Sequence, residues 1–155
     1  MLGDKNPSRR PEVRILLRES GKLTREHWKD PEFIRKQVRA RSKPKNKLEE
    51  MVESFLFGIL PDEYEFVGDG KFFLGTKNPD FICQQRKKII EVFGLYWHRD
   101  VLTNQTAEEH EKERIQLFKD QGWDTLVIWE GEEKDASALR EKVLNFHFKE
   151  KVQRL

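Results

Sequence analysis

One acidic residue lies inside the most apolar strand-like segment of the sequence, Lys88–Phe93. Isoleucine, valine and phenylalanine flank Glu91 there, so burying its charge is costly unless another group compensates it. Because side chains alternate between the two faces of a strand, apolar residues occupy both faces of this segment. The alternative, an edge strand whose glutamate points at water, is disfavoured by those apolar residues. Glu91 is therefore a candidate for chemistry.

A second carboxylate, Asp80, begins the preceding strand-like segment, and a polar turn at Gln84–Arg86 joins the two segments. Two antiparallel strands joined by a tight turn place the start of one beside the end of the other, so we expect Asp80 to approach Glu91. Two facing carboxylates repel each other unless a divalent cation lies between them, and oxygen ligands suit Mg²⁺, with Mn²⁺ as the alternative. Taken alone, an aspartate after a proline is more often a turn residue than a ligand.

A histidine follows seven residues after Glu91, just beyond the end of the strand. The neutral imidazole of His98 is suited to take a proton from an attacking water. An isolated histidine would carry no such meaning, but the two nearby carboxylates make His98 a candidate general base. No such pair of candidate carboxylates accompanies the other histidines (His27, His110 and His147), and we interpret them as surface or packing residues.

The helix that is predicted from Asn46 to Gly58 carries a third candidate acid. Glu49 lies three residues after Asn46, as a capping box requires. Its spacing relative to the apolar residues of the helix also turns it toward the buried side, where it is placed to join the other acids. The two interpretations are about equally supported, and Glu50 and Glu53 remain alternatives for the helix acid.

These side chains need a sheet to position them, and the hydrophobic spacing predicts a mixed one. Strands are predicted over residues 64–67, 71–74, 80–83, 88–93 and 124–129. Further helices are predicted over residues 106–121 and 136–148. Because a helix separates the last two strands, we expect them to pair in parallel through a crossover. The predicted class is α/β, a mixed sheet flanked by helices.

Charge divides the chain into a basic N-terminal arm, residues 1–43, and a domain, residues 44–155. The first 47 residues hold 15 Lys and Arg against 6 Asp and Glu, and the remainder holds 15 against 22. This asymmetry favours an arm that meets a polyanion and a domain that supplies carboxylates, although a solvated helical tail explains the composition equally well. Two short helices are predicted in the arm, over residues 12–19 and 31–40, the second with Asp30 as its N-cap.

Several classes of protein are excluded. Cys83 is the only cysteine, so the chain has no intrachain disulfide and no cysteine-rich zinc site. No apolar run approaches the roughly 20 residues of a membrane span, and the N-terminus has no apolar signal-peptide region. We therefore expect an intracellular, cytoplasmic protein with no membrane partner.

Three segments, in this order, carry a resemblance to a known family. They are Asn78–Ile82, Ile89–His98 and Gly122–Glu130. Together they resemble the very short patch repair (Vsr-like) endonuclease superfamily, and within it the homing endonucleases of the EDxHD group, a branch of the PD-(D/E)XK nucleases. The match covers about residues 44–133, and three blocks in order are specific where one alone would be weak. The resemblance implies a restriction-endonuclease-like core and a Mg²⁺-dependent endodeoxyribonuclease.

The resemblance also implies a set of metal ligands. Asp80 matches the metal-binding aspartate of the family, and Glu91 falls where PD-(D/E)XK nucleases carry their second acid. The main-chain carbonyl near Val92 would complete the site. Phe93 occupies the place of the usual lysine, so that role is vacant in this chain.

Further roles follow from the same resemblance. His98 matches the general base, while Glu49 and Asp100 match the acids that orient it or the hydrated metal. Tyr96 and Trp97 match aromatic residues that wedge between base pairs. We therefore expect double-stranded DNA as the partner, in a prokaryotic or phage-type host.

One departure from the repair enzymes favours one branch of the family over the other. Those enzymes hold a structural zinc, and Leu95 stands at one of its ligand positions, so we expect no zinc and favour a homing enzyme. A basic arm suits long DNA targets, which need backbone contacts beyond the catalytic core. The basic residues that we expect to contact DNA are Arg9, Arg10, Arg14, Arg39, Arg41, Lys43 and Lys45.

Two other functions stay open. One is a mismatch-repair or restriction-type nicking endonuclease, and the other is a catalytically inactive DNA-binding module. A single active site cuts one strand at each visit, so a double-strand break requires a homodimer on the DNA or two sequential nicks.

Overall fold

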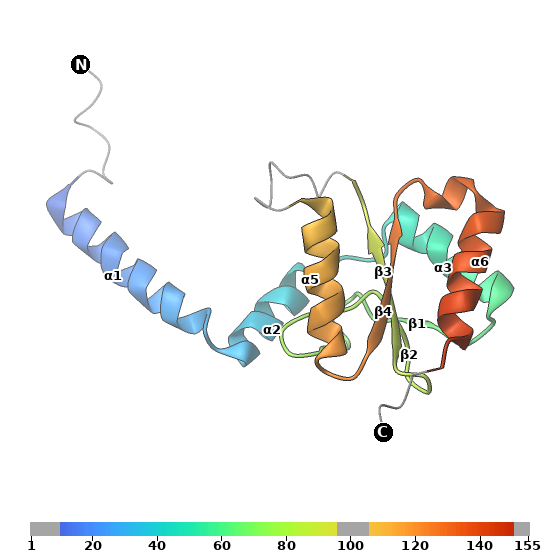
Figure 1. Cartoon of the computed structure of the whole chain (residues 1–155). Helices are drawn as coiled ribbons and strands as arrows, with labels where there is room; N and C mark the ends of the chain where they lie inside the picture. Colours follow the sequence, from blue (N-terminus) through green and yellow to red (C-terminus); the bar gives the residue numbers. More distant parts are fainter. Residues whose placement is uncertain (1–9, 96–105, 151–155) are drawn as a thin grey trace, which may run out of the picture.

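The computed structural model describes residues 10–95 and 106–150, which contain a four-stranded sheet (Figure 1). The strands are β1 (Glu65–Phe66), β2 (Phe81–Cys83), β3 (Lys88–Phe93) and β4 (Asp124–Trp129), side by side in that order. β1 with β2 and β2 with β3 pair antiparallel, whereas β3 and β4 pair in parallel. The fold is α/β with a mixed sheet, as the sequence predicts.

Helices cover both faces of the sheet (Figure 1). Helices α3 (Lys47–Ile59) and α6 (Ala136–Phe148) lie on one face, and α5 (Ala107–Lys119) lies on the other and connects β3 to β4. The core on the α3 and α6 side includes Val52, Leu56, Phe81, Ile90, Ile128, Leu139 and Val143. The core on the α5 side includes Val67, Ile82, Ile89, Phe118 and Trp123. Because β3 is buried on both faces, its sequence is a nearly continuous apolar run.

Capping residues set where the helices begin. The side chain of Asn46 accepts a hydrogen bond from the backbone N–H of Glu49 at 2.9 Å, and the Glu49 carboxylate accepts one from the backbone N–H of Asn46 at 2.8 Å. The predicted capping box is therefore confirmed. Thr106 and Glu109 form the same arrangement at the start of α5. A short 3₁₀ helix, η3 (Glu132–Lys134), precedes α6.

The predicted strand over residues 71–74 is wrong, because this segment is part of a loop. The side-chain amide of Asn78 donates to the backbone carbonyls of Val67 at 2.6 Å and Phe72 at 2.7 Å, and its oxygen accepts from the backbone N–H of Gly70 at 3.1 Å. Gly70 has a left-handed conformation, with φ of 84°. One side chain thus supplies hydrogen bonds that a neighbouring strand would otherwise supply.

The basic arm forms two helices, α1 (Pro11–His27) and α2 (Pro31–Arg41). Helix α2 agrees with the prediction, and Asp30 caps it by accepting from the backbone N–H of Glu32 at 3.0 Å. Helix α1 is longer than predicted because it continues through Gly21, a residue of low helix propensity at which the apolar pattern weakens.

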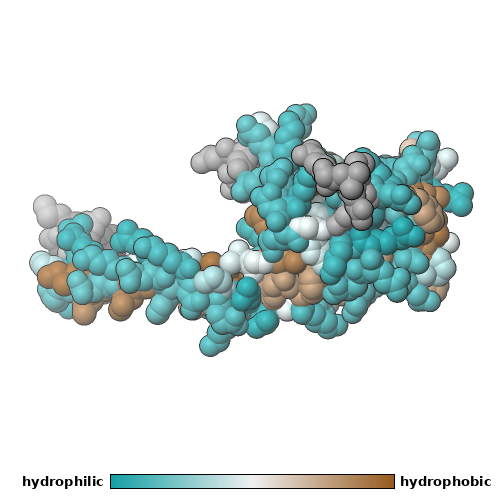
Figure 2. Space-filling model, turned by 60° about the horizontal axis from the view of Figure 1, so that its bottom comes forward, coloured by the Kyte–Doolittle hydropathy of each residue, from teal (hydrophilic) through white to brown (hydrophobic). Residues whose placement is uncertain are grey.

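The two arm helices differ in their relation to the sheet domain. Helix α2 contacts the loop before β2, where Arg35 Nε donates to the Gly75 carbonyl at 2.9 Å, while α1 extends away from the domain (Figure 1). Apolar side chains gather along one side of α1 (Figure 2); the most exposed are Ile15, Leu16, Leu17 and Leu23. None of the helices in the described ranges combines the length and the apolar character that a membrane span requires.

Candidate functional site

The pairing of β2 with β3 brings two acidic side chains together. Phe81 pairs with Ile90, so Asp80, one residue before β2, lies across from Glu91. The two carboxyl groups share a hydrogen bond. Asp80 Oδ2 also accepts from the backbone N–H of Val92 at 2.8 Å, which fixes the orientation of this carboxyl group on the sheet.

Arg114 of α5 compensates the charge of the buried glutamate. Glu91 is only 2% exposed, and Arg114 Nε donates to its Oε1 atom at 2.9 Å. The same guanidinium donates to the carbonyl of Asn78 at 3.0 Å and lies over the ring of Phe118, 4.9 Å from its centroid. Glu91 therefore faces the α5 side of the sheet, and its burial is stabilised by an ion pair with a defined geometry.

Glu49 is the third acid of this group. Its carboxylate caps α3 through Asn46, and it lies close enough to Asp80 for the two charges to influence each other. Both interpretations of Glu49, as capping acid and as neighbour of the acid pair, are therefore correct as structural statements. Of the other two helix acids, Glu53 pairs with Lys45 and Glu50 is exposed.

The pKa values of all three carboxyl groups are raised. Burial, and then the charge of Glu91, raise the pKa of Asp80 well above its ordinary value. Burial also raises the pKa of Glu91, although Arg114 opposes the shift, and burial raises the pKa of Glu49. The carboxyl groups of Asp80 and Glu91 therefore lose their protons less readily than free acids do, Asp80 most of all, and Arg114 is the group that favours the ionised form of Glu91.

This arrangement predicts how stability depends on pH. Because the pKa of Asp80 is higher in the folded chain than in the unfolded chain, the folded state binds more protons between the two values, and stability falls as pH rises through that window. We expect urea unfolding of the metal-free protein to show this loss above about pH 4, the ordinary value for Asp. Asp80→Asn should remove much of it, and Asp62→Asn should not; equal pH profiles for the two variants would contradict the shift.

The acids lie beside a cavity with a cationic rim. Glu49, Asp80 and Arg114 line a cavity of about 700 Å³. The other charged residues that line it are Arg41, Lys43 and Lys77, all exposed. Carboxylates inside a cavity whose rim is positive suit an anionic ligand that is bound together with a divalent cation.

The donor set fits Mg²⁺ or Mn²⁺. Each carboxyl group is oriented through one oxygen, by Asn46 for Glu49, by Val92 for Asp80 and by Arg114 for Glu91. A Cβ atom added at Gly68 would lie 3.2 Å from Asp80 Oδ1, so the glycine keeps the approach to that second oxygen open. Hard oxygen ligands of this kind match these cations rather than Zn²⁺.

Several residues that the sequence singles out lie outside the described ranges. They are Arg9, Tyr96, Trp97, His98 and Asp100. Phe93, which the resemblance places where a lysine is usual, is buried, and its ring stacks on that of His110 at 5.2 Å. Val92 contributes its backbone N–H to Asp80.

The six described basic residues that are predicted to contact DNA fall into three pairs. Arg41 and Lys43 reach the cavity, whereas Arg10 and Arg14 are exposed at the start of α1. The other two make contacts within the chain: Arg39 donates to the Gly70 carbonyl, and Lys45 pairs with Glu53.

Sequence reasoning missed Arg114, Lys77 and Asn78. Arg114 had one detectable signal, since it lies four residues before the buried Phe118 and so shares its helix face. Lys77 had none, because its place at the cavity depends on how the loop folds.

Comparison with known proteins does not assign this chain to a family. No protein-family model matches the chain, and a search of curated proteins finds no match.

Proposed function

We propose that this chain is a metal-dependent endonuclease that hydrolyses phosphodiester bonds in double-stranded DNA, on a restriction-endonuclease-like (PD-(D/E)XK) core. The observation that carries the proposal is the convergence of Glu49, Asp80 and Glu91 beside a cavity with a cationic rim. The order of strands and helices in the sheet domain is compatible with such a core.

In this proposal, Asp80 and Glu91 hold Mg²⁺, with the carbonyl of Val92 as a further ligand. When bound, the cation polarises the scissile phosphate and offsets charge on the leaving oxygen. Glu49 and Asp100 would orient His98 or the hydrated metal. His98 takes the proton from the attacking water, the role that the family resemblance implies for it. The role of Arg114 is to orient Glu91 and to oppose the rise in its pKa that burial causes.

The cations around the cavity support DNA as the substrate. Arg41, Lys43 and Lys77 lie at the edge of the cavity that Asp80 lines, where a phosphate backbone would pass on its way to the metal. Contacts of this type position a duplex without reading its sequence. The exposed Arg10, just before α1, and Arg14, in its first turn, lie farther from the sheet, which favours a homing-type enzyme with a long target.

Incubation of the full chain with supercoiled plasmid and Mg²⁺ is expected to yield nicked or linear DNA, and EDTA should prevent it. His98→Ala should slow cleavage by about 100-fold or more, the usual contribution of a general base, without weakening retention of DNA in a gel-shift assay. His27→Ala, on the exposed part of the arm, is the matched control and should cut at the parent rate. Intact plasmid with both Mg²⁺ and Mn²⁺ would contradict the nuclease proposal.

The type of nuclease needs a separate measurement. Long DNA is digested with Mg²⁺, and the ends of the products are mapped to sequence. Recurring ends at one long site support the homing type. Cleavage that requires a T·G mismatch, tested on matched and mismatched duplexes, would instead support repair.

A further inference from the structure

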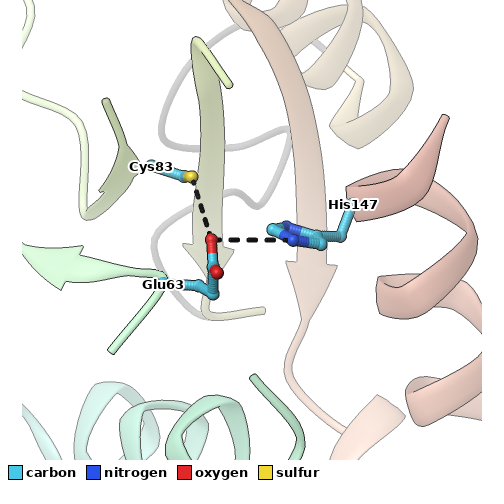
Figure 3. Close-up of side chains that lie close together, drawn as sticks. All are labelled: Glu63, Cys83 and His147. Carbon is cyan, nitrogen blue, oxygen red and sulfur yellow. Dashed lines mark hydrogen bonds and ion pairs between the residues drawn. The ribbon is translucent and has the colours of Figure 1, made fainter. Parts of the chain in front are cut away.

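Three side chains of different chemistry converge at the opposite end of β2 from Asp80 (Figure 3). Glu63 comes from the turn before β1, Cys83 from the end of β2, and His147 from the last turn of α6. Glu63 Oε2 lies 3.8 Å from Cys83 Sγ and 3.7 Å from His147 Nε2. One donor atom from each residue lies within 4.8 Å of the other two. A carboxylate, a thiol and an imidazole thus point toward one place.

A hydrogen bond with Tyr64 orients the imidazole ring of His147. His147 is 1% exposed, and its Nδ1 atom lies 3.2 Å from the Tyr64 hydroxyl. A hydrogen bond there leaves Nε2 directed at Glu63 and Cys83, and Nε2 is then the atom with the lone pair when Nδ1 carries the hydrogen. A hydrogen bond to the rear nitrogen is what metal-binding histidines usually have.

Cys83 shares its face of the sheet with a buried lysine. Cys83 pairs with Lys88 across the two strands, so their side chains lie on the same face of the sheet. The Lys88 ammonium is buried, where it donates to the carbonyls of Phe146 and Lys149 near the end of α6. Lys88 thereby joins the end of α6, which carries His147, to the strand pair that carries Cys83.

The cluster is also accessible from solvent. Glu63, Tyr64 and Cys83 line a cavity of about 1060 Å³, and the side chain of Glu63 is 39% exposed. This cavity is separate from the one beside Asp80, since the two share Pro44 as a lining residue but none of the acids. It offers an entry path and room for a water as the fourth ligand.

We propose that Glu63, Cys83 and His147 form a binding site for a divalent transition metal of the Zn²⁺ class. Thiolate, imidazole and carboxylate are the three protein ligands that Zn²⁺ takes, and a water completes a tetrahedral site. Mg²⁺ and Ca²⁺ prefer oxygen ligands throughout, so this donor set discriminates against them. On binding, Cys83 releases its proton to solvent as the metal–sulfur bond forms. The absence of a cysteine-rich zinc site does not exclude this one, which needs a single thiolate.

Metal bound here would join three separate parts of the chain. The turn before β1, the end of β2 and the end of α6 are brought together by residues 63, 83 and 147, which are far apart in the sequence. Because the unfolded chain does not hold these ligands in place, metal binding contributes to the stability of the fold.

The test is a titration of the metal-free full chain with Co²⁺, followed by absorption spectroscopy. Cys83 is the only cysteine, so a thiolate-to-cobalt charge-transfer band can come from no other residue. We expect the band to saturate at one Co²⁺ per chain and to disappear when Zn²⁺ displaces the cobalt. Zn²⁺ at about 100 times its Kd should raise Tm by about 5 °C or more, and an equal concentration of Mg²⁺ should not.

Variants identify the other ligands. Glu63→Gln should weaken Co²⁺ binding by about tenfold or more, whereas Glu65→Gln, an exposed glutamate that lines the same cavity, should not change it. Cys83→Ser should abolish the band. His147 is buried and its replacement risks misfolding, so Glu63→Gln and the parent protein decide the test.

Two results would overturn the proposal. One is the absence of a charge-transfer band together with no effect of Zn²⁺ on Tm, which would leave the cluster as hydrogen-bonded packing. The other is equal Co²⁺ affinity in Glu63→Gln and Glu65→Gln. Neither measurement uses DNA, so the outcome is independent of the nuclease proposal.

Discussion

Asp80→Asn should lower Mg²⁺-dependent cleavage of DNA by about 100- to 1,000-fold. Stabilisation of the transition state by a catalytic metal is worth several kcal/mol, and each 1.36 kcal/mol corresponds to about tenfold in rate. Asparagine has almost the same shape as aspartic acid, but it lacks the charge and the second oxygen that a cation requires. The measurement is the single-turnover cleavage rate on plasmid DNA at saturating protein.

The same variant should fold normally, which separates loss of chemistry from loss of structure. Asparagine Oδ1 can still accept from the Val92 N–H, and its amide can donate to Glu91, to which Asp80 is hydrogen-bonded. Asp62→Asn is the matched control, because Asp62 has a left-handed backbone, with φ of 60°, that asparagine tolerates well. A fully folded Asp80→Asn protein that cuts at the parent rate would remove Asp80 from the proposed site.

Arg114→Met should destabilise the metal-free protein by about 3 to 5 kcal/mol, the usual cost of leaving one partner of a buried ion pair without the other. Methionine keeps most of the side-chain volume on the Phe118 ring, but nothing replaces the hydrogen bonds to Glu91 and to the Asn78 carbonyl. Glu91, at 2% exposure, cannot recover those contacts from water. Urea unfolding of the parent and the variant measures the difference.

A double variant tests the cause of that loss. When Arg114→Met is combined with Glu91→Gln, no buried charge is left alone, so much of the lost stability should return. Lys112→Met, on the exposed side of the same helix, is the control for placing methionine in α5 and should change stability by less than about 0.5 kcal/mol. If Arg114→Met costs no more than Lys112→Met, the ion pair does not stabilise Glu91.

The elements that the sequence predicts best are those whose signals are local and redundant. β3, β4 and α6 begin and end where the apolar pattern places them, and the capping box at Asn46 sets the start of α3. The sequence also predicts the pairing of Asp80 with Glu91. One tight turn separates β2 from β3, and this leaves few possible registers between the two strands.

The sequence pattern does not predict contacts between residues that are far apart along the chain. Arg114 lies 23 residues after Glu91, and its role depends on the rotation of α5 about its axis, which apolar spacing defines only coarsely. His147 was interpreted as a surface or packing residue, because nothing near it in the sequence indicates that Glu63 and Cys83 lie beside it. The segment over residues 71–74 has strand-like composition. It forms no strand, because the side chain of Asn78, farther along the loop, donates to the backbone carbonyls of Val67 and Phe72.

The position of Asn78 has a consequence for how this protein can diverge. Its side chain bonds the backbone at Val67, Gly70 and Phe72 in the first part of the loop before β2. Its carbonyl accepts from Arg114, which in turn pairs with Glu91. The later part of the loop, between Phe72 and Asn78, contributes none of the hydrogen bonds described above that orient the acids. That part can therefore accept insertions and new side chains, and so acquire new recognition properties, while the chemistry beneath it stays the same.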